Sequence, residues 1–265
     1  MFDIKKRMNE HFNESLERYN YNNIIGLFCQ GSQNYGLETE NSDLDTKLII
    51  TPSFKEIAMN KKPVSTTHIR DNEEHIDAKD VRLYMETFRK QNLNFLEILF
   101  TPYFIINPIY EKEWNRLVQE REKIARMNPF RAIKSMKGIA LEKYHAMEHP
   151  YPSKLDILEK YGYDPKQLHH LLRVEEYLGR YINGELYANC LRPQGPEYLK
   201  SVKLGLYDLK TARKIAETAK ANVECIADEA CARYEDCEDS YAVELLRDVQ
   251  YNIMETAIKL EFRIG

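Results

Sequence analysis

Two aspartates separated by a single residue have the spacing that points most directly to chemistry in this sequence. Asp43 and Asp45 come just before the apolar, β-prone run 46–50, and side chains two apart on a strand point to the same face. Two adjacent carboxylates repel each other unless a cation is bound between them. Since Mg²⁺ binds a few carboxylates together with phosphate oxygens and water, the pair predicts a site for Mg²⁺ (or Mn²⁺) and a phosphate-bearing ligand.

A second element, Gly31-Ser32, lies shortly before the aspartates. It follows the apolar run 23–30, which is typical of a buried strand. Glycine lets the backbone approach a phosphate closely, and the Ser32 hydroxyl and the free amides of a helix start can donate hydrogen bonds to it. We therefore expect Gly31 and Ser32 to bind nucleotide phosphates, and Gly36 to form the turn that returns the chain to Asp43.

The elements that must position these residues can be predicted from periodicity. Residues 3–19 form an amphipathic helix, and short strands at 66–69 and 74–77 flank a turn at 71–73. A helical pattern then runs from Asp80, a plausible N-cap, to about Phe100. The apolar stripe of the first helix consists of Ile4, Met8, Phe12 and Leu16, and Asn92 and Asn94 are expected to break the later helix in two.

The character of the chain changes at Asn107-Pro108, after which only helical periodicity is found. Asp164-Pro165 is a strong helix start, with an Asp cap followed by Pro at the first helical position. The sequence therefore predicts an α+β chain with a mixed domain at 1–107 and an all-helical domain at 108–265. The helices expected in the second domain are 109–126, 129–147, 153–160, 165–183, 196–204, 209–231 and 239–262.

The succession of buried strand, Gly31-Ser32, turn, Ser42-Asp43-Leu44-Asp45 and second strand resembles the signature of the DNA polymerase β-like nucleotidyltransferase superfamily. The resemblance implies a nucleotidyltransferase catalytic domain at 1–107, with a palm formed by a small mixed sheet and helices. It also implies a third carboxylate, which helps to hold the metal and acts as base for the attacking hydroxyl.

Three residues are candidates for that third carboxylate. We favour Asp77, which ends the second strand of the predicted hairpin, where its side chain can lean toward Asp43 and Asp45. Asp80 is better explained as a helix cap, and Glu74 is expected near the turn in solvent. Metal binding and catalysis are therefore assigned to Asp43, Asp45 and Asp77, with Asp80 and Glu74 as alternatives.

A closer resemblance is to a bacterial and phage subgroup of predicted nucleotidyltransferases, some of them associated with RNA repair. It is carried by residues 80–84, 90–100 and 162–173, with Leu93 standing where many relatives have proline. Glu97, in the Leu-Glu-x-Leu-Phe element, could serve the site, but a capping or ion-pairing role is favoured. Lys166, His170 and Arg173 share one helical face, which by this resemblance is a nucleotide-binding clamp. The alternative is a packed histidine with two solvated cations.

Bulk properties limit the classes of partner. The net charge is −4, so any nucleic-acid site must be a local patch. A basic stripe at 123–143 could track a phosphate backbone, and a solvated helix face explains it at least as well. The 5 scattered cysteines predict free thiols rather than disulfides. With no long apolar run and no apolar leader, we expect a cytoplasmic protein with no membrane partner.

Together these features predict an enzyme that transfers an NMP from an NTP to a hydroxyl acceptor, without a template. An RNA end is one expected acceptor. A protein hydroxyl, modified by an AMPylating or toxin-system enzyme, is an alternative that the motif cannot separate from the first. A nucleotide-binding module without catalysis is a third. The sequence predicts neither the NTP nor the oligomeric state.

Overall fold

The computed structural model describes residues 3–39 and 42–264, so residues 40 and 41 of the predicted motif 31–45 lie outside the described part. The chain divides into two compact units. The first comprises residues 1–34, 40–127 and 238–265, and the second comprises 35–39 and 128–237. The boundary expected at 107/108 falls inside the first unit, which also includes the segment from Glu238 onward.

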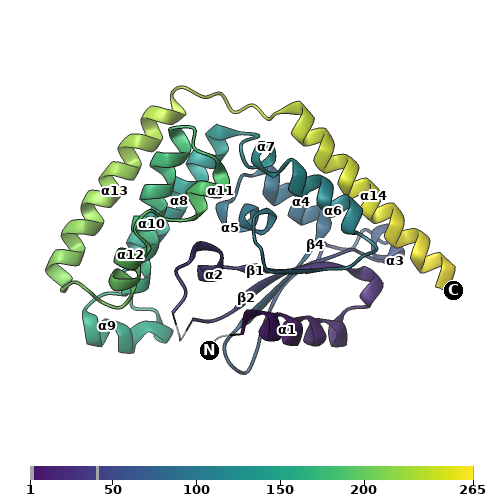
Figure 1. Ribbon diagram of the computed structural model, residues 1–265, viewed down its shortest axis with the longest axis horizontal. Coiled ribbons are helices and arrows are strands. Elements are labelled where there is room, and N and C mark those ends of the chain that lie inside the picture. The colour runs from purple at the N-terminus through teal and green to yellow at the C-terminus, as the bar shows by residue number, and fades with distance from the viewer. Residues whose placement is uncertain (1–2, 40–41, 265) are drawn as a thin grey trace. The chain divides into compact units, whose positions relative to one another are not determined.

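The first unit contains a mixed sheet of five strands in the order β3-β4-β2-β1-β5 (Figure 1). Strands β2 and β4 are parallel, and the other neighbouring pairs are antiparallel. The α+β class and the helical C-terminal region expected from the sequence are thus confirmed. The strands are β1 (Ile24–Gln30), β2 (Asp45–Ile50), β3 (Ser65–Ile69), β4 (His75–Asp80) and β5 (Phe104–Ile106).

The first helix, α1 (Ile4–Arg18), covers one face of the sheet (Figure 1). Its Met8 packs with side chains of β1, β2 and β4 in a single apolar cluster, and Ile4 and Phe12 pack against the edge of that cluster. Leu16, expected in the same apolar stripe, is 39% exposed. Polar His11 and Ser15 are buried in its place, so the helix presents a partly polar face to the sheet.

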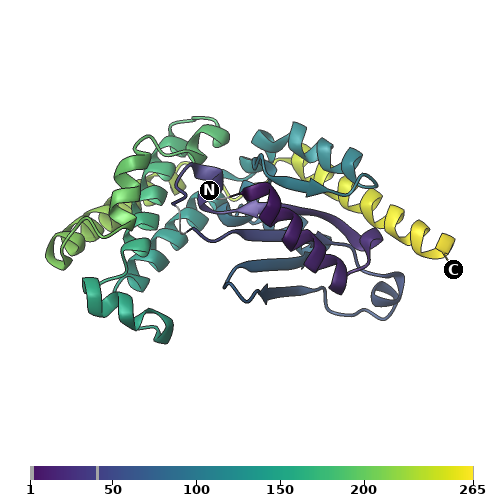
Figure 2. The same ribbon diagram turned by 60° about the horizontal axis from the view of Figure 1, so that its bottom comes forward.

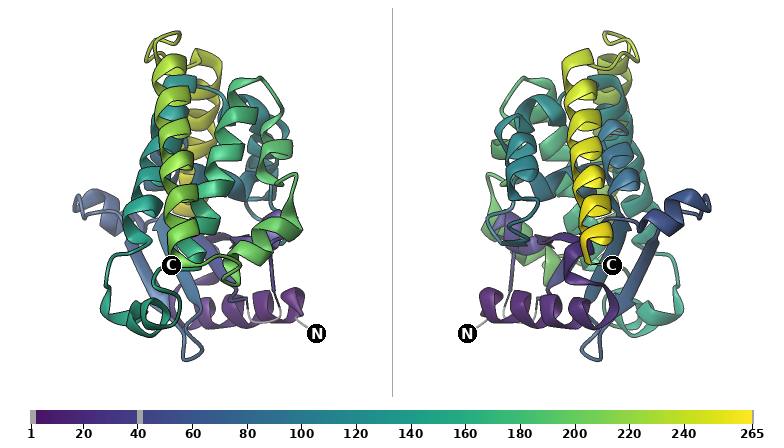
Figure 3. Two further views of the ribbon diagram at one scale, coloured as in Figure 1. Left: turned by 90° about the vertical axis from the view of Figure 1, so that its left-hand side faces the viewer. Right: turned by 90° about the vertical axis from the view of Figure 1, so that its right-hand side faces the viewer.

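Helices α4 (Val81–Arg89) and α5 (Leu93–Leu96) contact the opposite side of the unit, and α14 (Ser240–Ile264) packs against α4 and α6 (Glu111–Gln119) (Figure 3). Asp80 caps α4 by accepting the Arg82 amide at 2.8 Å, as predicted. The expected break near Asn92 is also confirmed, because its side chain caps α5. The remaining helices of this unit are α2 (Ser32–Tyr35, which crosses the boundary between units), α3 (Phe54–Ala58) and α7 (Arg121–Ala125).

The second unit is a bundle in which α8 (Pro129–Ala146), α10 (Pro165–Ile182) and α13 (Leu209–Cys231) pack against one another (Figure 3). The buried face of α13 is almost entirely small, with five alanines and Val223, so the three helices can approach closely. Shorter helices complete the unit: α9 (Leu155–Tyr161), α11 (Tyr187–Leu191) and α12 (Pro196–Lys203).

Candidate active site in the first unit

The Gly31-Ser32 turn follows β1 directly and opens α2. Gly31 has φ +98°, a left-handed conformation that a residue with a Cβ adopts only at a cost of about 1–2 kcal/mol. Its amide donates to Oε1 of Glu97 at 3.0 Å, and Glu97 is buried. The Gly31 amide is therefore bonded to protein rather than open to a phosphate, and Glu97 positions the turn. The first amides of α2, those of Ser32 and Gln33, have no partner within so short a helix.

Two amide side chains fix the turn to its surroundings. Gln33 donates from Nε2 to the carbonyl of Asp43 at 2.6 Å, and its Oε1 lies 3.5 Å from the Ser32 hydroxyl. Asn34 donates to the Cys29 carbonyl at 2.9 Å and accepts from the Thr101 hydroxyl at 2.6 Å. Gln33 therefore joins the two halves of the predicted motif. Sequence analysis gave it no role, because a polar residue in a short helix carries no local sign of burial.

Asp45 begins β2, directly opposite Gln30 at the end of β1, so the Gly-Ser turn and the aspartates lie at the same end of the sheet. Leu44 and Thr46 point to the α1 side, where Leu44 joins the core and Thr46 bonds to His11. By strand alternation the Asp45 side chain faces away from α1. Asp43 precedes β2, and its charge acts on the Arg7 guanidinium of α1, so a shared face for the two carboxylates stays a prediction. Asp43 is exposed, and the Asp45 side chain is 43% exposed.

His75, the first residue of β4, is an unpredicted neighbour of Asp45. Its amide donates to Asp45 Oδ1 at 3.2 Å, and its Nδ1 lies 3.4 Å from the same oxygen. The parallel pairing of β2 and β4 produces this contact, because it sets His75 one row before the Thr46–Ile76 pair. The hairpin strand predicted at 74–77 located the residue, but its partner strand was not evident from the sequence.

Asp77 lies on the same face as Asp45, opposite Lys47 in the parallel register. Its carboxylate forms an ion pair with Lys47 and lies 3.5 Å from the Thr67 hydroxyl. The Lys47 ammonium also lies 4.6 Å from the centre of the Phe95 ring. The residue predicted as the third carboxylate thus lies on the face of Asp45 but one pleat further along, and a lysine neutralises it.

Glu74 lies elsewhere than expected. It is fully buried on the α1 side of the sheet rather than in solvent, and Oε1 accepts the Leu44 amide at 2.8 Å. An ion pair with Arg7 and a bond from His11 at 3.0 Å surround it with donors. A buried carboxylate with several donors on the opposite face cannot be a ligand beside Asp45, so this alternative for the third carboxylate is wrong. Asp80 is likewise occupied, as cap and ion-pair partner of Arg82.

Burial determines the titration of two groups close to this site. It raises the pKa of the Cys29 thiol, with smaller contributions from the Glu97 and Asp45 carboxylates. It lowers the pKa of His11 to about 4, helped by Arg70. His11 is therefore neutral near pH 7, so that Nε2–H donates to Glu74 and Nδ1 accepts from Thr46.

The donor set suits Mg²⁺ bound with a nucleotide better than a metal held by protein alone. Within residues 3–39 and 42–264, no three His, Cys, Asp or Glu side chains are gathered closely enough to hold a metal. Mg²⁺ commonly takes only one or two carboxylates from the protein and completes its shell with substrate phosphates and water. The exposed pair Asp43 and Asp45 provides two hard oxygen ligands of that kind.

In the second unit, α10 carries the other three predicted site residues. Asp164 caps this helix through the Lys166 amide at 2.9 Å, which confirms the predicted start. Lys166 is exposed, whereas Arg173 is buried and stacks 4.1 Å from the centre of the Tyr35 ring. Burial lowers the pKa of His170 far below its usual value, and nearby Arg173 and other cations add to the effect. His170 is therefore a neutral, packed histidine, and Lys166 carries the accessible charge.

The basic stripe expected at 123–143 is largely paired with acidic residues. In the second unit Arg131 bonds to Asp236 at 2.7 Å and Lys137 to Asp228 at 2.6 Å, while Lys134 lies over the Phe130 ring. In the first unit, Lys123 lies over the Tyr241 ring. The five cysteines are free, as predicted.

No protein-family model matches the chain, and no curated protein matches it. Among the residues that the structure describes, none of the helices combines the length and the apolar character needed to cross a membrane. The function must therefore be inferred from the chemistry of the site itself.

Proposed function

We propose that this protein is a metal-dependent nucleotidyltransferase of the DNA polymerase β type, which transfers an NMP from an NTP to a hydroxyl acceptor without a template. One observation carries the proposal. The Gly31-Ser32 turn and Asp45 meet at the same end of the antiparallel pair β1–β2, and Gln33 joins the turn to Asp43. A phosphate-binding turn and a carboxylate pair at one edge are what a bound metal–triphosphate requires.

Asp43 and Asp45 are the residues that would hold the cation, and the Ser32 hydroxyl is proposed to donate to a phosphate oxygen. When bound, Mg²⁺ would neutralise the triphosphate and stabilise the charge that develops on the oxygens of the in-line displacement. The chain contributes position: Gln33 and the pairing of Gln30 with Asp45 fix the carboxylates relative to the turn.

Asp77 is proposed as the base. The acceptor oxygen forms a bond to the α-phosphorus, the bond from that phosphorus to the bridging oxygen breaks, pyrophosphate leaves, and the hydroxyl proton passes to a carboxylate. Asp77 is on the same face as Asp45, and to accept a proton it must exchange its pairing with Lys47 for the substrate hydroxyl.

Within the second unit we propose Lys166 and Arg173 of α10 as nucleotide-binding residues, with neutral His170 as a packing residue between them. An RNA end remains the proposed acceptor, and a protein hydroxyl the alternative. The described ion pairs of the basic stripe leave Lys166 as a more accessible cation than Arg131 or Lys137.

The proposal is tested by incubating the purified protein with each labelled NTP, Mg²⁺ or Mn²⁺, total RNA and cell lysate. We expect label in RNA in the wild type and none with Asp43→Asn combined with Asp45→Asn. Asp71→Asn combined with Asp156→Asn is a matched control, since both aspartates are exposed and outside the site. Label in protein bands instead supports the alternative acceptor. Transfer that persists in the Asp43/Asp45 double variant overturns the proposal.

A further inference from the structure

The peptide bond between Asp43 and Leu44 is hydrogen-bonded on both of its polar groups. Its carbonyl, that of Asp43, accepts from Gln33 at 2.6 Å. Its amide, that of Leu44, donates to Glu74 Oε1 at 2.8 Å. A peptide unit is planar, so bonds to both sides fix the plane and with it the directions in which the flanking side chains leave the backbone. Those flanking residues include Asp43, and Asp45 follows one residue later.

Glu74 can hold this amide firmly because the carboxylate is itself held from several directions. Its Oε2 accepts from His11 at 3.0 Å, from Arg70 at 2.8 Å and from Asn72 at 2.8 Å. Arg7 pairs with the other oxygen, on which the Leu44 bond also falls. Bonds to a buried, charged acceptor are stronger than neutral ones and leave it little freedom to rotate.

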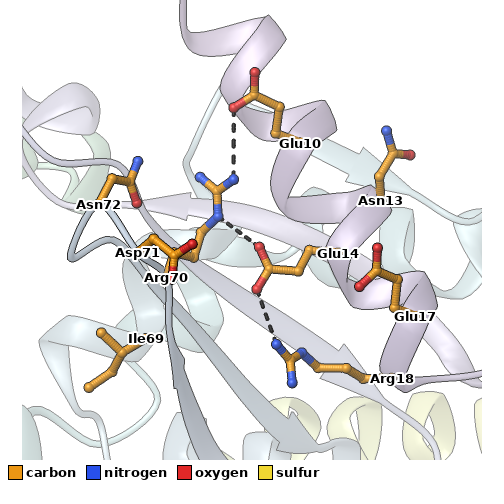
Figure 4. A pocket seen from close by; sticks show the side chains of 9 residues that line it. All are labelled: Glu10, Asn13, Glu14, Glu17, Arg18, Ile69, Arg70, Asp71 and Asn72. Carbon is orange, nitrogen blue, oxygen red and sulfur yellow. Dashed lines mark hydrogen bonds and ion pairs between the residues drawn. The ribbon is translucent and has the colours of Figure 1, made fainter.

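None of these four partners of Glu74 was predicted to belong to the site. Arg7 and His11 belong to α1, and Arg70 and Asn72 to the β3–β4 hairpin. Arg70 also reaches across the open groove between the two, where it bonds to Glu14 at 2.8 Å (Figure 4). In Figure 2, the β3–β4 hairpin and α1 lie side by side in the first unit. The carboxylate thus ties α1 and the hairpin to the one amide between the two aspartates.

We infer that Glu74 is a positioning residue for the Asp43–Asp45 cation site, acting from the far face of the sheet through the Leu44 amide. The inference rests on the proposed function, because it assigns the carboxylate pair to cation binding. Groups that orient metal ligands without touching the metal typically change metal affinity by ~10–100-fold when altered. Glu74 stands in that relation to Asp43 and Asp45.

The test uses the full chain and Mn²⁺, titrated by the loss of the free-ion electron paramagnetic resonance signal, with a non-hydrolysable NTP present. Glu74→Asp keeps the charge and withdraws the carboxylate by one methylene, so that it no longer reaches the Leu44 amide. We expect its Mn²⁺ dissociation constant to rise at least ~10-fold. Glu73→Asp, the same change at the exposed neighbour, is the control and is expected to bind Mn²⁺ as the wild type does.

A second readout reports the hydrogen bond itself. In the wild type the Leu44 amide is expected to exchange slowly with deuterium, and in Glu74→Asp at least ~10-fold faster, while the core amides of β2 stay protected. Glu74→Gln, which keeps the length and one acceptor oxygen, serves where the shorter side chain prevents folding. Because it retains an acceptor for Leu44, we expect a smaller loss of Mn²⁺ affinity than in Glu74→Asp.

The outcomes separate the two ideas. A wild type that neither binds Mn²⁺ nor transfers label overturns the proposed function, and the role of Glu74 with it. A wild type that binds Mn²⁺, with folded Glu74→Asp or Glu74→Gln binding it equally well, overturns only the positioning role. Unchanged Leu44 exchange in Glu74→Asp does the same. A loss of thermal stability with unaltered Mn²⁺ affinity marks Glu74 as structural alone.

Discussion

His169, on the helix that carries the predicted nucleotide-binding residues, allows a quantitative prediction of how stability depends on pH. The side chain is 2% exposed, and Nδ1–H donates to the Leu199 carbonyl at 2.8 Å. Burial lowers its pKa from 6.5 to about 4, against the Leu199 bond and with help from Arg173, Lys203 and Lys166. With this lowered pKa the imidazole is neutral in the folded protein near pH 7.

The sign follows from proton linkage. Between pH 6.5 and 4 the unfolded chain binds a proton at this position and the folded chain does not, so acidification favours unfolding. The stabilising contribution of neutral His169 is fully present above the pKa of this residue in the unfolded chain. It is lost as the pH falls toward the pKa of His169 in the folded chain. The whole interval is worth about 3 kcal/mol at about 1.4 kcal/mol per pKa unit, and about 2 kcal/mol of that is lost between pH 7.5 and pH 5.

The variant His169→Asn keeps a side-chain N–H near the Nδ1 position and cannot titrate. Its smaller volume lowers stability equally at both pH values, so only the pH dependence is informative. Urea unfolding at pH 7.5 and pH 5 is followed by far-ultraviolet circular dichroism. The free energy of unfolding should fall by about 2 kcal/mol less in the variant than in the wild type. Equal losses in both proteins would refute the burial argument for His169.

Two further changes separate individual effects. Asp77→Asn should lower kcat by ~100-fold or more and leave Mn²⁺ affinity unchanged, as expected of a base and not of a ligand; steady-state kinetics with Mn²⁺ titration checks this, and a matching loss of affinity contradicts it. Gly205→Ala should cost ~1–3 kcal/mol more than Gly184→Ala, because both have positive φ but only a Cβ at Gly205 would lie 2.4 Å from the Tyr161 ring. Thermal unfolding of the two variants measures the difference, and equal melting temperatures would exclude the clash.

The sequence predicts the structure where a local signal decides it. The bounds 209–231 of α13 were predicted correctly, because Asp208 caps the helix and alanines repeat along one face. Strand β5 was not predicted, since Phe104–Ile106 is only three residues long and becomes a strand by pairing with β1. Helices α3 and α11, of five residues each, were missed for the same reason of length.

In the candidate site, too, a local pattern specifies some features, whereas others depend on distant contacts. The face of Asp45 follows from strand alternation, which a local pattern specifies. The burial of Glu74 was not, because its partners Arg7 and His11 precede it by more than sixty residues and reach it only in the folded chain. The pairing of Asp77 with Lys47 also depends on the register of two parallel strands, which no local pattern specifies.

The return of α14 to the first unit has a consequence for biosynthesis. The helix belongs with the sheet, and Arg89 of α4 is bonded to Glu238 just before it at 2.8 Å. During translation the helical segment 128–237 is complete before residues 238–264 leave the ribosome. The second unit can therefore form before α14 packs on the first. Released fragments that stop short of α14 would contain the aspartates but lack the helix that packs on α4 and α6. Synthesis thus delays the packing of α14 on α4 and α6 until segment 128–237 has been made.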